Sequence, residues 1–239
     1  MIKKILQFLL SIFFGLLFRL EKKEKSSSNF VQVSKLYAKG GFGELFAKIR
    51  IWDTPLELLE KMVPKNGLIA DLGCGDGLVT NYLALKASTR QIIGIDKNLS
   101  RIELADKGLD NTKFVEGDVL KQLLPPSDVI LMVHLLHHLP SFKDQETVLR
   151  ECQNKIKKGG ELVIVEIDRK PFLKYLLTWI VDILIFPILF EGKIVSPKIY
   201  YRTGEQWRVF LEKIGFDVQV IEAHRGKPFS HIILVGKKC

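Results

Sequence analysis

The segment from Leu68 to Gly77, LIADLGCGDG, holds the residues whose types and spacing point most directly to chemistry. A short apolar run leads through Asp71 into three glycines that alternate with other residues, and a helical pattern starts at Leu78. Because glycine has no Cβ, such a turn lets the backbone bend sharply and approach a ligand closely. A strand, a glycine-rich turn and a helix in this order predict a nucleotide-type cofactor site, although a tight loop without a ligand is also built from glycines.

The spacing of the glycines separates two kinds of cofactor turn. A dinucleotide-binding turn has the pattern G-x-G-x-x-G. Gly73 and Gly75 fit that pattern, but Leu78 stands where its third glycine belongs, and Gly77 comes one residue too early. The pattern here is D-x-G-x-G-x-G, with the acid one residue into the turn. It leaves an NAD-dependent dehydrogenase as the less favoured alternative.

Polar residues follow the next three predicted strands. Asp96 ends the apolar run 91–95, and an acid at that position is placed to bind both hydroxyls of a ribose. The run 113–116 leads to Gly117-Asp118-Val119, and the run 128–133 leads to His134-Leu135-Leu136-His137-His138-Leu139. Four features in this order are more specific than a glycine turn alone.

These features resemble the motifs of the class I S-adenosylmethionine (SAM)-dependent methyltransferases, from Thr54 to about Gly236. The resemblance is to bacterial-like enzymes acting on small molecules or lipids, and it implies SAM as the cofactor. It also implies that Asp118 binds the adenine amino group and that Val119 packs on the adenine ring. The cofactor-binding residues expected from the turn, the strand ends and this resemblance are Asp71, Gly73, Cys74, Gly75, Gly77, Asp96, Lys97, Asp118, Val119 and His134.

The order of apolar runs predicts the fold class. We expect an α/β, doubly wound, Rossmann-like seven-stranded sheet with a terminal antiparallel strand, formed by residues 54–239. The later strands are expected at residues 161–167, 217–221 and 231–235, with the last two as an antiparallel pair at the sheet edge. Ser141 and Thr203 are expected to cap helices, and Lys157-Lys158-Gly159-Gly160 to stop the first of them.

Methyl transfer from a sulfonium is an in-line displacement, so the protein must chiefly align the acceptor and exclude water. A general base is needed only where the acceptor has to lose a proton. The catalytic candidates are His134, which directly follows the fourth strand, and Asp168, which follows the fifth; His137, His138 and His231 are weaker ones. Cys74, Cys152 and Cys239 have no metal-ligating spacing, so no metal is expected and a reducing compartment is favoured.

Residues 1–25 form a separate apolar segment in a chain of net charge +9. A cleaved signal peptide is disfavoured by the charged residues 21–25, and a spanning helix by the shortness of the apolar run. A helix in the membrane interface, or a short anchor with snorkelling Lys and Arg, fits best. The basic cluster at residues 22–25 then faces anionic head groups, which predicts a location at the cytoplasmic face of the membrane.

Residues 26–53 are expected to be a linker and an N-terminal cap, with Ser26-Ser27-Ser28-Asn29 as a polar boundary. The cap is implied by the resemblance, which also places Tyr37, Phe42 and Trp52 in the substrate wall. Residues 171–201 are an insertion with a second apolar run. A core helix is the plainer interpretation of that run. We favour an apolar lid over the substrate site, with residues 172–190 as a second membrane contact.

The sequence thus predicts a SAM-dependent methyltransferase that modifies a small, lipophilic acceptor (a quinone, a lipid or a polyketide-like molecule) at the membrane surface. The Asn/Asp-Pro-Pro-aromatic motif of nucleic-acid amino-methyltransferases is absent after the fourth strand, so no nucleic-acid partner is expected. A non-catalytic SAM-binding or scaffold protein of the same fold is the main alternative. The acceptor atom, the oligomeric state and the membrane topology stay open.

Overall fold

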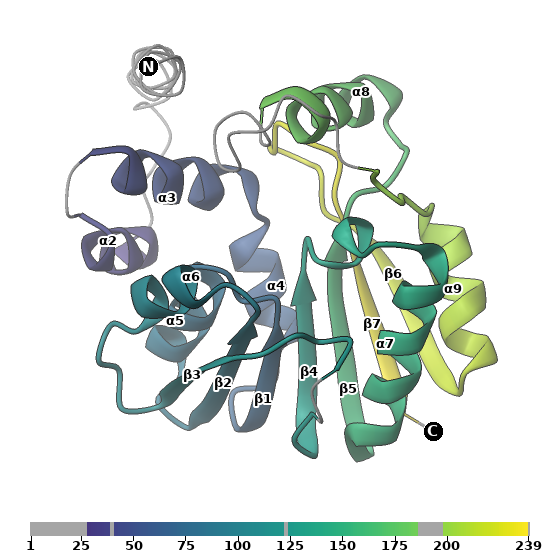
Figure 1. Ribbon diagram of the computed structural model, residues 1–239, viewed down its shortest axis with the longest axis horizontal. Helices are drawn as coiled ribbons and strands as arrows, with labels where there is room; N and C mark the ends of the chain where they lie inside the picture. The colour runs from purple at the N-terminus through teal and green to yellow at the C-terminus, as the bar shows by residue number, and fades with distance from the viewer. Residues whose placement is uncertain (1–27, 39–40, 122–123, 186–197, 239) are drawn as a thin grey trace.

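The computed structural model describes residues 28–38, 41–121, 124–185 and 198–238, and its centre is a seven-stranded sheet (Figure 1). The strand order is β3-β2-β1-β4-β5-β7-β6. β7 pairs antiparallel with both β5 and β6, while the pairings from β3 to β5 are parallel. The strands are β1 (Gly67–Leu72), β2 (Arg90–Asp96), β3 (Thr112–Glu116), β4 (Ser127–Val133), β5 (Ile156–Glu166), β6 (Phe216–Glu222) and β7 (Ile232–Lys238).

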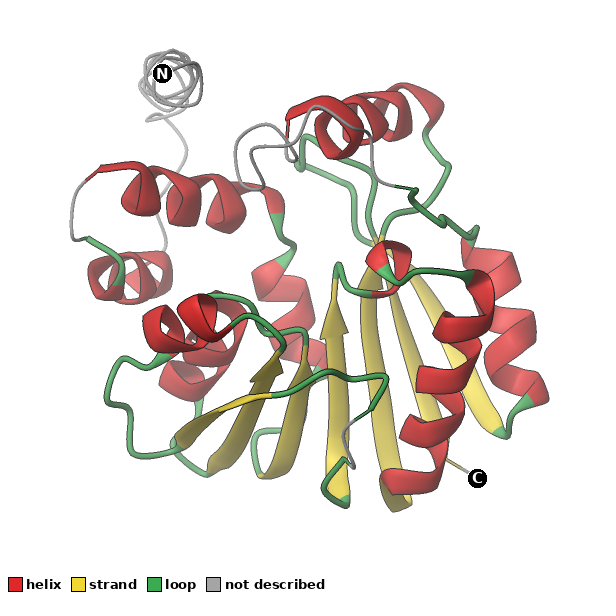
Figure 2. Ribbon diagram, viewed as in Figure 1, coloured by secondary structure: helices red, strands yellow, loops and turns green. Residues whose placement is uncertain are grey.

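Helices cover both faces of the sheet (Figure 2). One apolar cluster joins α2, α4 and α5 to side chains such as Ile69 and Leu131, and the other joins α7 and α9 to Ala70 and Met132. Successive residues of β1 and β4 enter opposite clusters, as the alternation of a strand requires. The helices are α2 (Ser28–Leu36), α3 (Gly41–Asp53), α4 (Leu56–Met62), α5 (Leu78–Lys86), α6 (Leu99–Ala105), α7 (Phe142–Lys155), α8 (Phe172–Ile180) and α9 (Gly204–Lys213).

The carboxyl ends of the parallel strands meet at one edge of the sheet, the upper edge in Figure 1, and α3 and α8 lie above it. β7 runs in the opposite direction, and Ile232 at its start pairs with Glu166 at the end of β5. The residue before β7, His231, is therefore at the same edge as the residues that follow β4 and β5. This is the edge at which ligands bind in open α/β sheets.

The fold class and the terminal antiparallel strand are confirmed. Ser141 caps α7 through the Asp144 N–H, and Thr203 forms a full capping box with Gln206 at α9. α7 ends at Lys155, just before the expected stop, but the expected start of the next strand at residue 161 was wrong, because β5 begins at Ile156 and runs through residues 157–160. The β4–β5 register shifts between Ser127 and Val129 at this point.

The segments outside the core are described in part. Ser28 and Asn29 were expected in a polar linker, but they form the first turn of α2. The apolar segment 1–25 lies outside the described residues, as do residues 186–197 of the insertion. The rest of the insertion contains α8 and a π-helical turn, Val181–Ile185. Within the described parts of the chain, no helix has both the length and the apolar character needed to cross a membrane.

Candidate cofactor and active site

The turn after β1 has the geometry that its glycines predict. Gly73, Gly75 and Gly77 all have positive φ angles, of 71°, 60° and 73°. The N–H groups of Gly73 and Cys74 donate to the Ile95 carbonyl at 2.7 and 3.1 Å, which fixes the turn to the end of β2. A left-handed backbone costs an ordinary L-residue about 1–2 kcal/mol, so the turn depends on glycine.

The three glycines differ in what surrounds them. A Cβ on Gly73 would lie 2.7 Å from Leu135 Cδ1, and one on Gly77 would lie 2.7 Å from the Ala105 Cβ. A Cβ on Gly75 would meet no atom closer than the Arg50 Nη1 at 3.5 Å. Gly73 and Gly77 are thus required for packing, whereas a Cβ on Gly75 would make only ordinary van der Waals contacts, with the side-chain ends of Arg50 and Arg101.

Asp96 lies at the end of β2, next to Gly75, and its side chain is buried. Its Oδ2 atom accepts from the Gly75 N–H at 2.9 Å, and Oδ1 accepts from the Asn98 N–H at 2.9 Å. A carboxylate has about four lone-pair sites, so each oxygen keeps capacity for one more donor. This fits the predicted contact with two ribose hydroxyls.

The third predicted segment lies next to Asp96. The Gly117 N–H donates to the Asp96 carbonyl at 2.9 Å, and Asp118 Oδ1 accepts from the Leu120 N–H at 3.0 Å. Val119 is half-buried against the apolar cluster of α7 and α9. The Lys97 side chain is exposed to solvent. Asp118 and Val119 directly follow Gly117, which is bonded to Asp96, so these three residues can contact one ligand. Lys97 lies on the solvent-exposed side of Asp96.

The side chains of Asp71 and Cys74 are buried inside the protein at the turn. Asp71 was expected one residue into the turn, but it lies within β1, 1% exposed, and accepts from Thr80 Oγ1 of α5 at 2.5 Å. Burial raises the pKa of Asp71 to about 7, and the Thr80 hydrogen bond opposes that shift. Burial also raises the pKa of the Cys74 thiol, whose sulfur faces Gly94. Direct cofactor contact by these two side chains stays a prediction.

Residues of the N-terminal cap contact the cofactor turn. The Tyr37 hydroxyl donates to the Asp76 carbonyl at 2.8 Å and accepts from Asn81 Nδ2 at 2.9 Å. Arg50 of α3 pairs with the Asp76 carboxylate at 3.1 Å. Tyr37 was expected in the cap, but no motif marks Arg50. Of the other two expected residues, Phe42 has no described side chain, and Trp52 lies at the end of α3, next to Asp53.

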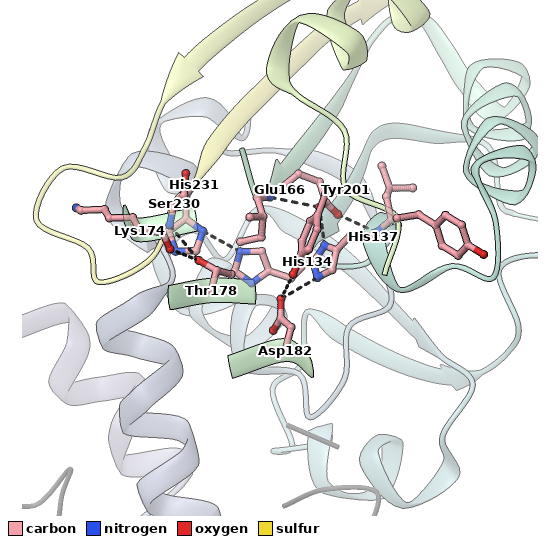
Figure 3. A network of polar contacts seen from close by, with 12 residues as sticks. His134, His137, Glu166, Lys174, Thr178, Asp182, Tyr201, Ser230 and His231 are labelled. Carbon is pink, nitrogen blue, oxygen red and sulfur yellow. Dashed lines mark hydrogen bonds and ion pairs between the residues drawn. The ribbon is translucent and has the colours of Figure 1, made fainter. Parts of the chain in front are cut away.

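His134 has an unusual backbone and a defined partner. Its φ of 53° is the single positive φ outside glycine in the described part of the chain, and its N–H donates to the Val165 carbonyl at 2.9 Å. Its Nε2 atom lies 3.2 Å from His231 Nδ1, and the two rings stack, as Figure 3 shows. Burial lowers the pKa of His134 well below its ordinary value, and the nearby His231 and His137 add to that shift.

Asp53, at the end of α3, completes a row with these two histidines. Its Oδ1 atom lies 2.7 Å from His231 Nε2, and the His231 side chain is fully buried. Donor atoms of Asp53, His134 and His231 lie within 4.8 Å of one another, a spread that a metal ion can also bridge. The sequence named His231 only as a weak base candidate and gave no signal for Asp53.

A second polar network begins at His137 and reaches the insertion (Figure 3). His137 Nδ1 lies 2.6 Å from Glu166 Oε2 at the end of β5. Its Nε2 atom lies 3.9 Å from Asp182 Oδ2, and Asp182 accepts from the Tyr201 hydroxyl. This network joins the ends of β4 and β5 to the π-helical turn after α8. His138 is exposed, and its ring centroid lies 4.1 Å from that of His137.

Asp168 and Arg202 make structural contacts. Asp168 Oδ1 accepts from the Arg169 N–H at 2.8 Å and from the Gly204 N–H of α9 at 3.2 Å. Arg202 donates to Gln145 Oε1 and Glu146 Oε1, both at 2.9 Å, so its ion pair is internal. A catalytic role for Asp168 stays a prediction, with the helix cap as its described contact.

The comparisons with known proteins agree with this geometry. Residues 70–164 match the family model described as a methyltransferase domain. The chain is 31% identical over 134 residues to a demethylmenaquinone methyltransferase of Thermotoga maritima, covering 52% of this chain and 57% of that protein. It is 29% identical over 110 residues to a ubiquinone biosynthesis O-methyltransferase of Pseudomonas putida, covering 43% and 45%. The chain spans about half the length of the curated relatives it matches.

Solved structures show the same fold. A SAM-dependent methyltransferase from Aquifex aeolicus has a TM-score of 0.59 at 18% identity, covering 88% of this chain and 98% of that one. Human N-acetylserotonin methyltransferase in complex with SAM has a TM-score of 0.63 at 19% identity, covering 90% and 60%. The fold is the one that these SAM-dependent methyltransferases share. The match of residues 70–164 to a methyltransferase domain agrees with the resemblance to class I methyltransferases and with SAM as the cofactor.

Proposed function

We propose that this protein transfers the methyl group of SAM to a small, lipophilic acceptor of quinone, lipid or polyketide-like kind at the cytoplasmic face of a membrane. The observation that carries the cofactor part is the position of Gly75 in the turn beside Asp96. The Gly75 backbone has φ 60°, and only the side-chain ends of Arg50 and Arg101 lie within 4 Å of where a Cβ would be. Its N–H donates to the Asp96 carboxylate. A cofactor that must lie against the chain fits there.

In this proposal each site residue has a defined task. Asp96 binds the two ribose hydroxyls with the lone pairs that Gly75 and Asn98 leave free. Asp118 binds the adenine amino group, and Val119 packs on the ring. Tyr37 and Arg50 hold the turn in place through Asp76. SAM supplies an electrophilic methyl group, so the protein aligns the acceptor with it and keeps water away.

Helix α8 supports a lipophilic acceptor, because its apolar side faces solvent. Its exposed side chains follow a helical stripe: Phe172 is 65% exposed, Leu173 78%, Leu176 38%, Leu177 46% and Trp179 41%. The polar side faces the protein instead. Lys174 Nζ donates to the His224 and Lys227 carbonyls at 2.6 Å, and the buried Thr178 accepts from the Ser230 N–H at 3.4 Å.

An exposed apolar stripe on a helix whose polar groups are bound internally marks an interaction site. A bilayer is the occupant that we propose, because the stripe resembles the buried side of an interfacial helix. Residues 1–25 and the net charge of +9 favour the same surface. The stripe and the carboxyl edge of the sheet are joined through Asp182, which reaches Tyr201 and His137. In this proposal the insertion is a lid, and an acceptor from the bilayer passes it to reach the carboxyl edge of the sheet.

The acceptor class has further support from two relatives. They are named for demethylmenaquinone methylation and for O-methylation in ubiquinone biosynthesis. A test is transfer of radiolabelled methyl from SAM to a bacterial membrane-lipid extract by the full chain in detergent micelles. Label in the organic phase supports the proposal. Label only in water-soluble or nucleic-acid fractions contradicts the acceptor class, and no transfer to any fraction favours the non-catalytic alternative.

A further inference from the structure

We propose that Asp53, His231 and His134 form a proton relay in which His134 is the general base, so that the acceptor is methylated on a hydroxyl. This inference rests on the proposed methyl transfer. The three residues lie far apart in the sequence, at the end of α3, before β7 and after β4. The relay assigns a task to Asp53, for which no motif gives a role.

The row has a defined order. Asp53 Oδ1 lies 2.7 Å from Nε2 of His231, and the opposite ring nitrogen, Nδ1, lies 3.2 Å from Nε2 of His134. The His231 side chain is fully buried, with 0% exposure, while His134 and Asp53 are half-buried. His134 and Asp53 are therefore the two ends of the row, and Asp53 holds the central histidine in place.

The contacts determine the hydrogen positions in the neutral state. Asp53 as a carboxylate accepts only, so His231 donates from Nε2 and keeps a lone pair on Nδ1. That lone pair accepts the Nε2–H of His134. The remaining nitrogen of His134, Nδ1, is then unprotonated and has the lone pair that a general base needs. A proton taken up at His134 Nδ1 leaves the hydrogen bond from Nε2 to His231 in place, and Asp53 keeps His231 in the tautomer that accepts it.

The fold supports this arrangement at both ends. Lys227 Nζ donates to the Trp52 carbonyl at 2.7 Å, which fixes the end of α3 to the loop before β7 and brings Asp53 to His231. His134 directly follows β4, the neighbour of β1, and the next residue, Leu135, lies against Gly73 of the cofactor turn. The left-handed backbone of His134 is a strained position of the kind that clusters at active sites.

A metal ion is the competing occupant of these residues. An ion takes one nitrogen of a histidine ring, and Asp53 and His134 contact opposite nitrogens of His231. An ion held by His134 Nε2 and His231 Nδ1 would leave Asp53 as an outer partner of His231 and would have two protein ligands from the trio. Protein zinc sites have three or four. The contacts thus fit a relay better.

A base of this kind is needed for a hydroxyl and not for a thioether or a tertiary amine. In the step, the acceptor O–H bond breaks and the proton goes to His134 Nδ1. The acceptor oxygen forms a bond to the methyl carbon while the carbon–sulfur bond breaks. The electron pair of the broken bond stays on sulfur. The proton leaves His134 for solvent afterwards, which restores the neutral row.

The first test measures which histidine ring nitrogens carry a hydrogen, and it needs no methyl acceptor. The full chain is labelled with ¹⁵N-histidine in detergent micelles, and long-range ¹H–¹⁵N correlation spectra give the protonation of each ring nitrogen. His134→Asn and His231→Gln assign the signals, and Asn suits His134 because it tolerates a positive φ. The relay predicts neutral rings at pH 7 with the proton on Nε2 in both. A proton on His134 Nδ1, or stoichiometric shifts of both rings on adding Zn²⁺ or Mg²⁺, overturns it.

The second test separates chemistry from binding. His134→Asn is expected to lower the rate of methyl transfer to the lipid extract about 100-fold or more, and Asp53→Asn about tenfold. S-adenosylhomocysteine affinity should stay within about twofold in both variants. His224→Asn, a histidine outside the row, is the matched control. An equal loss of affinity and rate in the variants contradicts the relay. If the unmodified protein does not bind S-adenosylhomocysteine, the proposed function is contradicted. The ¹⁵N spectra of the first test then decide whether the relay exists.

Discussion

His137 Nδ1 and Glu166 Oε2 lie 2.6 Å apart in a fully buried pair that joins the end of β4 to the end of β5. The other carboxylate oxygen of Glu166 accepts from the Leu136 N–H at 2.8 Å. Burial has the largest single effect and lowers the pKa of His137, but the charge and hydrogen bond of Glu166, together with the charge of Asp182, outweigh it, so the net shift is upward. The pair therefore favours a charged His137 in the folded protein.

Glu166→Gln should destabilise the fold by about 3–5 kcal/mol at about pH 6, because a buried charge then loses its partner. A histidine with a raised folded pKa stabilises fully below its unfolded pKa of about 6.5, and that stabilisation is lost as pH rises through the folded pKa. The difference between the two proteins should thus shrink towards about pH 9. Denaturant unfolding at both pH values measures it.

Asp182 and Tyr201 also face His137, so Asp182→Asn is the matched variant for that test. It removes a carboxylate that lies 3.9 Å from His137, farther than Glu166. A smaller loss of stability is expected for it. If Asp182→Asn is as costly as Glu166→Gln, the short contact is not the dominant one.

The glycines of the turn should separate binding from folding. Gly75→Ala should lower the unfolding free energy by about 1–2 kcal/mol, the cost of its positive φ, because its Cβ would make no contact closer than 3.5 Å. It should nevertheless abolish S-adenosylhomocysteine binding at micromolar concentrations. Gly77→Ala should cost about 1–3 kcal/mol more, because its Cβ would lie 2.7 Å from the Ala105 Cβ. Binding by Gly75→Ala at normal affinity would mean that the ligand does not approach this backbone.

Asp96→Asn should weaken S-adenosylhomocysteine binding by about 2 kcal/mol, or about 30-fold, since the ribose hydroxyls lose a charged acceptor. Asn has nearly the same volume, and its oxygen can still accept the Gly75 N–H. Asp106→Asn is the control, because Asp106 accepts from the Gly108 N–H in an exposed loop. Calorimetric titration of the variants gives the comparison. Equal affinities for the Asp96 variant and the control would refute the ribose contact.

The stripe of α8 should bind lipid. Leu173→Gln with Leu177→Gln should weaken partition of the full chain into vesicles of phosphatidylglycerol and phosphatidylcholine by about tenfold, from the lost burial of two leucines. Leu99→Gln with Leu104→Gln is the control, since these leucines of α6 are 51% and 59% exposed. Vesicle flotation measures the bound fraction. A control pair that loses as much binding as the α8 pair argues against a dedicated lipid face.

Local patterns predicted much of this molecule because their causes are local. The strand, turn and helix around Gly73 to Gly77 follow from hydrophobic runs and from glycine's conformational range, and Ser141 and Thr203 act within their own helices. The segment at Gly159 was predicted wrongly because glycine after lysines also suits a strand whose register shifts.

The row of Asp53, His231 and His134 could not be predicted in the same way. Asp53 and His231 are 178 residues apart, and His134 and His231 are 97 apart. Their meeting depends on β7 running antiparallel beside β5 and on α3 folding back over the sheet. The outward-facing apolar side of α8 could not be predicted for a similar reason. Its polar side faces the protein because Lys174 binds the carbonyls of residues 224 and 227, which are far from it in the sequence.

The most direct test of the central claim is calorimetric titration of the full, detergent-solubilised chain with S-adenosylhomocysteine and, separately, with NAD. We predict micromolar binding of S-adenosylhomocysteine at one site per chain and no binding of NAD. Binding of NAD alone, or of neither compound, would contradict the account of the Gly73–Gly77 turn as a SAM site.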